Sequence, residues 1–223
     1  MIKNKNIIII GSSSELAQEV LKQLIQSNTI FSISLKDSDD TKHLKVTNYV
    51  EEAKNIVEFI SSVHSPIVIF FNGYLAENRP IQNPTSYEIV KTLEINYFIP
   101  YKLTEMIVNQ NIQIKKLVFI SSFAAGKQRY KNFIYGYSKR LLEESIKYLN
   151  PNNYLLIRFG KIKTSMSKNH SSSFFDLDKK KAANIIVKFL VSKEGLVYPN
   201  ISTKILSILI KMIPTSIIKL LNI

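Results

Sequence analysis

Cysteine is absent from this chain of 223 residues, and so is tryptophan. The absence of cysteine excludes disulfide bonds and thiolate metal sites, and it leaves the redox compartment of the protein open. Histidine is also scarce, because only His43, His64 and His170 occur. They lie far apart in the sequence, with no carboxylate at a spacing that suggests a ligand set. We therefore expect no metal site.

The chain also lacks any long uninterrupted apolar run. A membrane-spanning helix needs about 20 predominantly apolar residues, and no such stretch occurs. The run from Ile7 to Ile10 is too short for the apolar region of a secretory signal, and it leads directly into a glycine–serine turn. We expect neither a transmembrane helix nor a signal peptide, and hence a cytoplasmic protein.

Acidic residues are few. Asp and Glu number 17 against 30 Lys and Arg, which gives a formal net charge of +13. The lysines are dispersed, and the longest block is Lys179 to Lys181. A recognition helix, an RNA-binding aromatic signature and a zinc finger are all missing, so we expect no nucleic-acid partner. An anionic membrane surface, a phosphate-bearing substrate and a general enrichment in lysine are each compatible with the charge.

What the sequence does contain is a regular alternation of short apolar runs and longer amphipathic ones. Hydrophobic residues make up 45% of the chain, enough for one domain with a large core. Continuously apolar runs predict buried strands, and apolar residues three and four apart predict helices. The predicted strands are Asn6–Ile10, Ile30–Leu35, Leu44–Val46, Ile67–Phe71, Lys116–Ser121, Tyr154–Phe159 and Gly195–Tyr198. The predicted helices are Glu15–Gln26, Val50–Val63, Tyr87–Val108, Tyr135–Tyr148 and one from Asp178 to about Leu190.

This order predicts an α/β fold, a doubly wound parallel sheet of the Rossmann type with three α/β/α layers. The domain spans residues 1–200, and residues 201–223 form an apolar, basic tail rather than a second domain. We expect Pro100 to bend the helix over Tyr87–Val108, because proline lacks an N–H. Asp178 is expected to cap the last helix of the domain.

A serine-rich turn follows the first predicted strand, where doubly wound sheets bind phosphate groups. It reads G-S-S-S-E-L-A, from Gly11 to Ala17. Gly11 permits a tight turn, the serines offer N–H and hydroxyl donors, and the helix N-terminus adds its positive dipole. The glycine fingerprint of dinucleotide-binding turns is incomplete, because Glu15 and Ala17 stand at its later glycine positions. A pyrophosphate site and a plain serine-rich helix cap are therefore both open here.

Two tyrosine–lysine pairs have the spacing of a proton-transfer couple. Side chains four residues apart share a helical face, where an ammonium stabilises a neighbouring phenolate. With 11 tyrosines and many lysines, such pairs arise readily by chance. Tyr87 with Lys91 and Tyr135 with Lys139 both qualify, so the spacing alone does not choose between them.

The surroundings favour Tyr135 and Lys139. Ser122 ends a buried strand thirteen residues before Tyr135, where its hydroxyl would reach the same substrate oxygen. Asn96 lies in the helix one strand–helix unit earlier, and a strand that ends R-F-G-K-I-K-T follows the pair. None of these features accompanies Tyr87.

In this order and spacing, the motifs make the sequence resemble the short-chain dehydrogenase/reductase family over nearly its whole length. The family's phosphate turn corresponds to Gly11–Ala17, and the segment after its fourth strand to F-F-N-G, Phe70–Gly73. Its P-G-x-V-x-T segment corresponds to F-G-K-I-K-T, with Phe159 in place of proline. The resemblance implies an NAD(P)-dependent oxidoreductase acting on an alcohol or carbonyl group, assembled as a homo-oligomer.

The resemblance also implies roles. The catalytic residues would be Asn96, Ser122, Tyr135 and Lys139. Tyr135 would be the general acid in reduction, and Ser122 would polarise the carbonyl. Lys139 would bind the nicotinamide ribose and favour the tyrosine phenolate, while Asn96 would hold the water of a proton relay. The implied cofactor-binding residues are Gly11, Ser13, Ser14, Glu15, Leu16, Lys36, Asp37, Asn72, Gly73, Tyr135, Lys139, Ile162 through its backbone and Thr164 through its side chain.

The choice between NAD and NADP stays open. The second predicted strand ends L-K-D, so that Asp37 would accept from a ribose 2′-hydroxyl or Lys36 would meet a 2′-phosphate. Lys45 stands where the family usually has an adenine-contacting aspartate.

One branch of the family is more similar than the rest. Strings within Ser121–Lys139, Ile157–Ser167 and Ile213–Lys219 are similar to the decaprenylphosphoryl-2-keto-ribose reductases. Those enzymes work with a flavin oxidase and reduce the 2-keto intermediate of a polyprenyl-phosphate pentose. The resemblance implies reduction of a lipid-linked or nucleotide-linked keto sugar in cell-envelope glycan synthesis, with a flavin oxidase as partner. A basic group that flanks the predicted site would hold the substrate phosphate: Lys127, Arg129, Lys131, Lys161 and Lys163.

The C-terminal tail bears on the same question. Lys204, Ser207 and Lys211 fall on one helical stripe, with isoleucine and leucine around the rest, and Pro214 interrupts the pattern. Because every charge in the tail is positive, the segment suits a helix lying in an anionic interface, and hence a peripheral membrane contact. Packing of the tail on the protein's own core or on a partner subunit is equally open.

Two further functions stay open. A general short-chain reductase of a soluble keto substrate would have little need for the apolar tail. A non-catalytic NAD(P)-binding subunit of a membrane complex is favoured by the glycines missing at Glu15 and Ala17. The complete set of Asn96, Ser122, Tyr135 and Lys139 opposes it.

Overall fold

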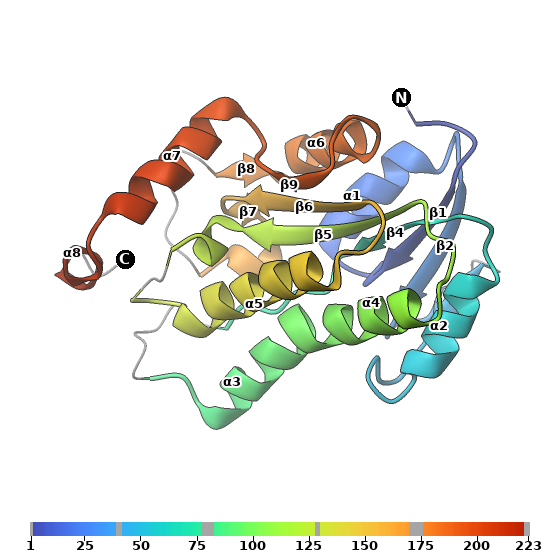
Figure 1. The fold of residues 1–223 in the computed structure, drawn as a ribbon, viewed down its shortest axis with the longest axis horizontal. Helices are drawn as coiled ribbons and strands as arrows, with labels where there is room; N and C mark the ends of the chain where they lie inside the picture. Colours follow the sequence, from blue (N-terminus) through green and yellow to red (C-terminus); the bar gives the residue numbers. More distant parts are fainter. Residues whose placement is uncertain (1, 39–41, 77–82, 128–129, 170–175, 221–223) are drawn as a thin grey trace.

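The centre of the protein is a parallel sheet. The computed structural model describes residues 2–38, 42–76, 83–127, 130–169 and 176–220. Seven strands pair in the order β3-β2-β1-β4-β5-β6-β9 (Figure 1). They are β1 (Asn6–Ile10), β2 (Thr29–Ser34), β3 (His43–Lys45), β4 (Ile67–Phe70), β5 (Lys116–Ser122), β6 (Tyr154–Phe159) and β9 (Gly195–Val197). A separate parallel pair joins β7 (Ile162–Lys163) to β8 (Leu177–Asp178).

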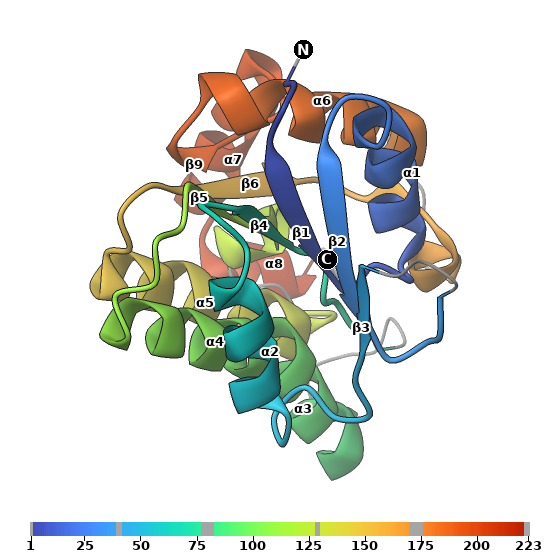
Figure 2. The same ribbon diagram turned by 90° about the vertical axis from the view of Figure 1, so that its right-hand side faces the viewer.

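Helices cover both faces of the sheet, as Figure 2 shows. One face carries α1 (Glu15–Leu24) and α6 (Lys179–Ser192), and the other carries α2 (Ala53–Ser61), α4 (Ile99–Asn109) and α5 (Phe133–Leu149). The remaining helices are α3 (Ser86–Leu93), α7 (Ile201–Met212) and α8 (Thr215–Leu220), with short turns η1 (Glu94–Phe98), η2 (Phe123–Ala125) and η3 (Ser165–Ser167). The predicted three-layer, doubly wound fold is confirmed.

The composition of β1 explains why the sheet is central. Ile7 and Ile9 point into the core beneath α1 and α6, whereas Ile8 and Ile10 point into the core beneath α2, α4 and α5. All four side chains are fully buried. Burying each one contributes about 1.5–3 kcal/mol relative to leaving it in water. A strand without an exposed face is therefore driven to the middle of the sheet.

The sheet reverses its direction of growth at β1, which pairs with β2 on one side and with β4 on the other. The register sets Ile10 opposite both Ile33 and Phe70, so the three strands end at one level. The N–H of Phe71 then donates to the carbonyl of Ile10 at 2.8 Å. In doubly wound folds this crevice beyond the carboxyl ends is the ligand site.

The helix predicted over Tyr87–Val108 is interrupted earlier than expected. The irregular segment is η1, a π-helical turn in which the N–H of Ile99 donates to the carbonyl of Glu94, five residues back. Pro100 lies in the first turn of α4, and it has no N–H to donate to the carbonyl of Asn96, four residues back. Proline therefore widens the turn before it rather than bending the helix at its own position.

Most other predicted boundaries lie within a few residues of the observed ones. The strand over Tyr154–Phe159 is exact, and Asp178 caps α6 by accepting from the N–H of Lys180 at 2.8 Å. Residues 201–220 form α7 and α8, so the predicted tail is helical where it is described. None of the described helices is long and apolar enough to traverse a bilayer.

Candidate active site

Helix α5 carries both Tyr135 and Lys139, one turn apart. The Nζ of Lys139 donates to the carbonyl of Ile120 at 3.1 Å, so its head group lies against the end of β5. The side chain is buried, whereas Tyr135 is half-buried. Gly136, which lies between them in the sequence, lets α5 approach η2 closely, because a Cβ at this position would lie 2.8 Å from the carbonyl oxygen of Ala124.

Burial changes the acid–base properties of Lys139. Desolvation lowers the pKa of its ammonium from 10.5 to about 8, and the nearby carboxylate of Glu143 opposes that shift. Near neutral pH the Lys139 amine can therefore be either protonated or neutral. One N–H of the ammonium is used by Ile120, which leaves two donors for other partners.

Ser122 lies at the last position of β5, two residues beyond the carbonyl that Lys139 contacts. Its Oγ accepts from the N–H of Ala124 at 3.2 Å and so caps η2. A hydroxyl that accepts in this way keeps its proton for donation to another oxygen. The ammonium of Lys139 is thus held against a carbonyl two residues before Ser122 in β5.

Asn96 connects two parts of the site rather than facing it with a free amide. From η1, its Oδ1 accepts from the N–H of Tyr74 and its Nδ2 donates to the Tyr74 carbonyl, both at 2.8 Å. The same Nδ2 donates to Ser138 at 3.2 Å, and Ser138 donates to the carbonyl of Tyr135. Asn96 is fully buried. Its side chain therefore fixes the segment after β4 against α5.

The phosphate turn has the backbone geometry that a close ligand approach requires. Gly11 has a φ of +76°, and a Cβ there would lie 3.0 Å from the backbone nitrogen of Asn72. Only glycine fits both conditions without strain. The Oδ1 of Asn72 is buried without a hydrogen-bond partner, so an acceptor next to the turn is unused. Ser14 caps α1 by accepting from the N–H of Ala17 at 3.2 Å, whereas Ser13 is exposed.

Glu15 contributes a contact that the glycine it replaces would lack. Its carboxylate accepts from the N–H of Ser165 at 2.7 Å and pairs with Lys179 at 2.9 Å. These hydrogen bonds lower the pKa of Glu15 to about 2, so it is ionised and its charge is compensated. The phosphate turn is thereby tied to η3, which follows β7. Leu16 points into the core, so only its backbone remains for a cofactor.

The segment after β6 closes the site from the other side. Thr164 caps η3 and Ser167 donates to the carbonyl of Ile162 at 2.7 Å. A Cβ on Gly73 would lie 3.6 Å from the methyl carbon of Met166. The structure thus brings Gly11, Gly73 and Thr164 to neighbouring segments, as predicted from their separate motifs.

The end of β2 forms a second, exposed part of the site. Asp37 pairs with Lys45 at 2.8 Å, and both side chains are largely exposed. Lys36 is also exposed, and its carbonyl contacts the ring nitrogen of His43 at 2.9 Å. Among the described residues at this strand end, the carboxylate of Asp37 therefore shares its surroundings with two lysines.

A buried ionic network beneath the predicted catalytic residues was not predicted from the sequence. Arg158 of β6 donates through Nε to Glu143 of α5 at 2.7 Å and through a second nitrogen to the other carboxylate oxygen. Ser121 donates to the same carboxylate, and Arg158 donates to the hydroxyl of Tyr198 at 2.9 Å. A single arginine within an otherwise apolar strand was the available signal, because a buried charge requires a partner.

The competing tyrosine–lysine pair lies elsewhere. Tyr87 and Lys91 are on α3, where Lys91 donates to the Tyr87 hydroxyl at 2.9 Å. The Tyr87 side chain is 66% exposed, and the ammonium of Lys91 also lies 4.8 Å from the ring centre of Tyr74. Of the predicted basic group, Lys161 pairs with Asp176 and Lys127 contacts the carbonyl of Lys211, while Arg129 lies outside the described residues.

The described residues form no cluster of three or more potential metal ligands. Instead, the crevice offers a glycine-based turn at a helix N-terminus, a half-buried phenol, a buried ammonium and a hydroxyl. Such a set can bind a dinucleotide phosphate and deliver a proton to an oxygen.

The fold is shared with solved short-chain dehydrogenases. The short-chain dehydrogenase from Burkholderia cenocepacia in complex with NADP superposes with a TM-score of 0.75 at 14% identity, over 94% of each chain. An aldohexose dehydrogenase from Thermoplasma acidophilum gives 0.70 at 16% identity, over 90% of this chain and 95% of that one. The carbonyl reductase Sniffer of D. melanogaster gives 0.69 at 18% identity, over 89% and 97%. No protein-family model and no curated protein sequence matches the chain.

Replacing Glu143 by glutamine should strongly destabilise the protein. The change leaves the Arg158 guanidinium buried without a carboxylate, which costs about 3–5 kcal/mol. Urea unfolding at pH 7 measures the loss. Glu144→Gln is the matched control, because Glu144 is the exposed neighbour on the same helix and should change stability by less than about 0.5 kcal/mol. Equal stabilities for the two variants would contradict the network.

Replacing Lys139 by methionine should leave the fold at least as stable at pH 7. The folded-state pKa, about 8, lies below the ordinary 10.5, so the native chain bears the cost of a buried charge below pH 8. Between pH 8 and 10.5 the unfolded chain retains the proton and native stability rises. The advantage of the variant in urea unfolding should therefore shrink from pH 7 to pH 10. Lys147→Met, an exposed change on α5, should show no such trend.

Proposed function

We propose that this chain is an NAD(P)H-dependent oxidoreductase that reduces a keto group on a sugar. One observation carries the proposal. The Lys139 ammonium of α5 is held at the end of β5 two residues from the Ser122 hydroxyl, with Tyr135 one turn before it on the same helix. This arrangement supports a site in which the phenol, the ammonium and the hydroxyl would act together at the carboxyl end of β5.

The residues of the crevice fit a dinucleotide. The turn at Gly11 brings backbone close to the segment after β4, and the buried Oδ1 of Asn72 lacks a partner. Gly11, Ser13, Ser14 and the N-terminus of α1 would hold the phosphates, while Ile162 and Thr164 would adjoin the nicotinamide. The charge of Glu15, which stands where the fingerprint has glycine, is compensated by Lys179. When bound, the cofactor would supply the hydride, which no side chain can provide.

The chain's own residues would then move a proton. Ser122 would donate a hydrogen bond to the carbonyl oxygen and polarise it. Tyr135 would transfer its phenolic proton to that oxygen as the hydride reaches the carbon. The resulting phenolate would be stabilised by the Lys139 ammonium and reprotonated from solvent. In this scheme the side chain of Asn96 positions the segments at Tyr74 and Tyr135. Its backbone carbonyl receives no N–H from Pro100 and would hold the water of the proton relay.

Two observations favour a phosphate-bearing sugar as the substrate class. Lys163 and Lys168 are exposed next to the segment after β6, which offers cations for a phosphate. The same fold serves the Thermoplasma aldohexose dehydrogenase, whose substrate is a sugar. Together with similarity to the polyprenyl-phosphate keto-pentose reductases, they support a lipid-linked sugar of envelope-glycan synthesis. Such a substrate would bring the enzyme to a membrane surface, with a flavin oxidase as its partner.

NADPH is the cofactor that the end of β2 favours. The carboxylate of Asp37, which would bind a ribose 2′-hydroxyl, is already paired with Lys45. Lys36 and Lys45 together would place two positive charges near a 2′-phosphate.

Tyr135→Phe should lower turnover at least about 100-fold, because the general acid is lost while the ring remains. The assay follows NADPH consumption with a polyprenyl-phosphate keto-pentose. Tyr87→Phe is the matched control, because Tyr87 has the same i,i+4 lysine, hydrogen-bonded at 2.9 Å, on the surface of α3. Near-normal turnover by Tyr135→Phe would refute the assignment.

Lys45→Ala should reduce the preference for NADPH over NADH about tenfold or more, since it frees Asp37 and removes one cation. Because the chain has no tryptophan, the fluorescence of bound NADPH and NADH can be titrated without transfer from that residue. Lys22→Ala serves as control, because Lys22 forms a similar exposed ion pair with Glu19 on α1. If neither nucleotide binds the native chain, the proposed oxidoreductase function is wrong.

A further inference from the structure

Helix α7 exposes more of its large apolar side chains than it buries. Its two most buried side chains are the hydroxyls Thr203 and Ser207. Five of its large apolar side chains, at positions i, i+4, i+7, i+8 and i+11, share one outward arc, which we call the apolar face of α7. This face consists of Ile201 (75% exposed), Ile205 (52%), Ile208 (50%), Leu209 (55%) and Met212 (75%).

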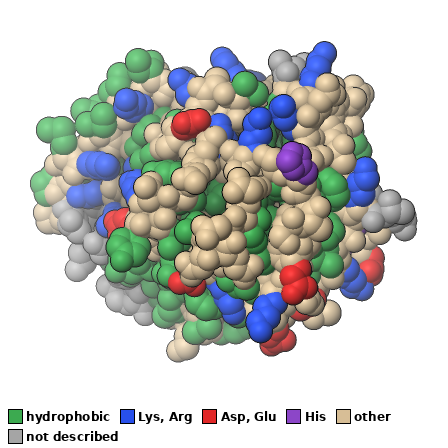
Figure 3. Space-filling model, turned by 45° about the vertical axis from the view of Figure 1, so that its right-hand side comes forward, with side chains coloured by type: hydrophobic (Ala, Val, Ile, Leu, Met, Phe, Trp, Pro, Cys, Tyr) green, Lys and Arg blue, Asp and Glu red, His purple; other side chains and the backbone are tan. Residues whose placement is uncertain are grey.

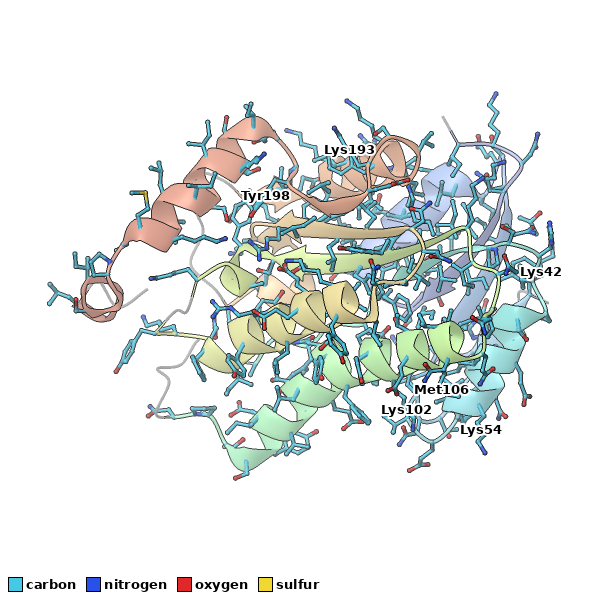
Figure 4. The ribbon with its side chains drawn as sticks, in the orientation of Figure 1. Lys42, Lys54, Lys102, Met106, Lys193 and Tyr198 are labelled. Carbon is cyan, nitrogen blue, oxygen red and sulfur yellow. The ribbon has the colours of Figure 1, made fainter. Side chains whose placement is uncertain are left out.

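The fold does not use this face to hold the helix in place. The inner side combines polar and apolar groups: Ser207 donates to the hydroxyl of Tyr198 at 3.2 Å, Lys127 donates to the carbonyl of Lys211 at 3.5 Å, and Leu206 and Ile210 are half-buried. Figure 4 shows Tyr198 between α7 and the sheet. Asn200 and Thr203 cap the helix start reciprocally. The apolar face is thus surplus to the internal packing of the described chain, and an exposed apolar patch of this kind marks an interaction site.

The charge around the apolar face is uniformly positive. After Glu194 the sequence contains no acidic residue, and its charged residues are Lys204, Lys211 and Lys219. Lys204 and Lys211 are exposed and flank the apolar arc on one side. A two-fold contact with a second copy of this face would bring these lysines together with no acid in the segment to oppose them. Lipid phosphates supply the opposite charge.

The apolar face also lies at the end of the molecule where the candidate site opens. In Figure 1, α7 and α8 lie beyond the carboxyl ends of β5 and β6. A Cβ on Gly126, just past η2 and Ser122, would lie 3.4 Å from the Oγ of Ser207. Figure 3 shows hydrophobic side chains gathered with basic ones along the left edge, where α7 lies in Figure 1. Ile217 and Leu220 extend the exposed apolar surface along α8.

We propose that the apolar face of α7 docks on an anionic lipid bilayer, with the helix lying in the interface and its lysines at the headgroups. A helix of 12 residues is too short to cross the hydrocarbon core, but it suits an interfacial position. Each lysine near an anionic surface adds electrostatic attraction. The inference rests on the proposed function in one respect: it gives a lipid-linked substrate a route to the crevice from the membrane.

Co-sedimentation of the full chain with vesicles tests the proposal. We expect binding to phosphatidylcholine vesicles that contain 30–40% phosphatidylglycerol, roughly the range at which a few lysines and an apolar face suffice, and much weaker binding to phosphatidylcholine alone. The triple variant Ile205→Ser/Ile208→Ser/Leu209→Ser should bind at least tenfold more weakly. Lys204→Glu/Lys211→Glu should lose most of the preference for the anionic vesicles.

Matched control variants distinguish binding through this face from nonspecific adsorption to vesicles. Ile25→Ser/Val90→Ser/Val191→Ser removes three equally exposed aliphatic side chains from other helices, and Lys54→Glu/Lys188→Glu reverses two exposed lysines away from α7. Both controls should bind vesicles like the native chain. Thermal unfolding should be nearly unchanged in the α7 triple variant, because its side chains are exposed.

Three outcomes would overturn the docking proposal: no binding to anionic vesicles, equal loss in the controls, or unaltered binding by the α7 variants. Sedimentation velocity without vesicles provides another test, because dissociation of an oligomer by the triple variant, with vesicle binding intact, would assign the face to a second copy. The readout needs no cofactor and no substrate. Failure of vesicle binding is therefore distinguishable from failure of the oxidoreductase function, which nucleotide titration reports.

Discussion

A carboxylate and a guanidinium buried together fix the geometry on which the candidate site depends. Glu143 and Arg158 hold α5 against β6, and through Ser121 the same carboxylate reaches the end of β5. These are the elements that carry Lys139 and Ser122. Because an unpaired charge at this depth would cost several kcal/mol, the pair tolerates little displacement, and so do the proposed catalytic groups next to it.

The network extends in two directions from that pair. Toward the crevice, Glu143 supports the charged form of Lys139, against the desolvation that lowers its pKa. Toward the C-terminus, Arg158 reaches Tyr198, whose hydroxyl also accepts from Ser207 of α7. A continuous set of polar contacts therefore joins the candidate site to the helix with the exposed apolar face. Elsewhere, the hydrogen bonds of Asn96 and Glu15 join segments that are distant in sequence.

Much of this arrangement could be predicted from the sequence because it depends on local patterns. Continuous apolar runs such as Asn6–Ile10 indicated buried strands, and the alternation with helices indicated the layers. The fine structure could not be predicted where it depends on long-range partners. The side-chain hydrogen bonds of Asn96 require the loop at Tyr74, and the role of Glu15 requires Ser165, 150 residues away. The exposure of the apolar face of α7 could not be predicted either, because periodicity does not tell which side of a helix packs against the rest of the domain.

The exposed apolar residues of α7 are under a different constraint from the apolar residues of the core. Substitutions in the core alter folding whatever else they do, so a stability threshold limits them. The stability threshold does not limit substitutions at Ile201, Ile208 and Met212, because these exposed side chains contribute little to folding. Left to drift, such positions would acquire the polar residues common on protein surfaces. The proposed docking on a lipid surface would account for their apolar character, and substitutions at the same positions would alter solubility without unfolding the domain.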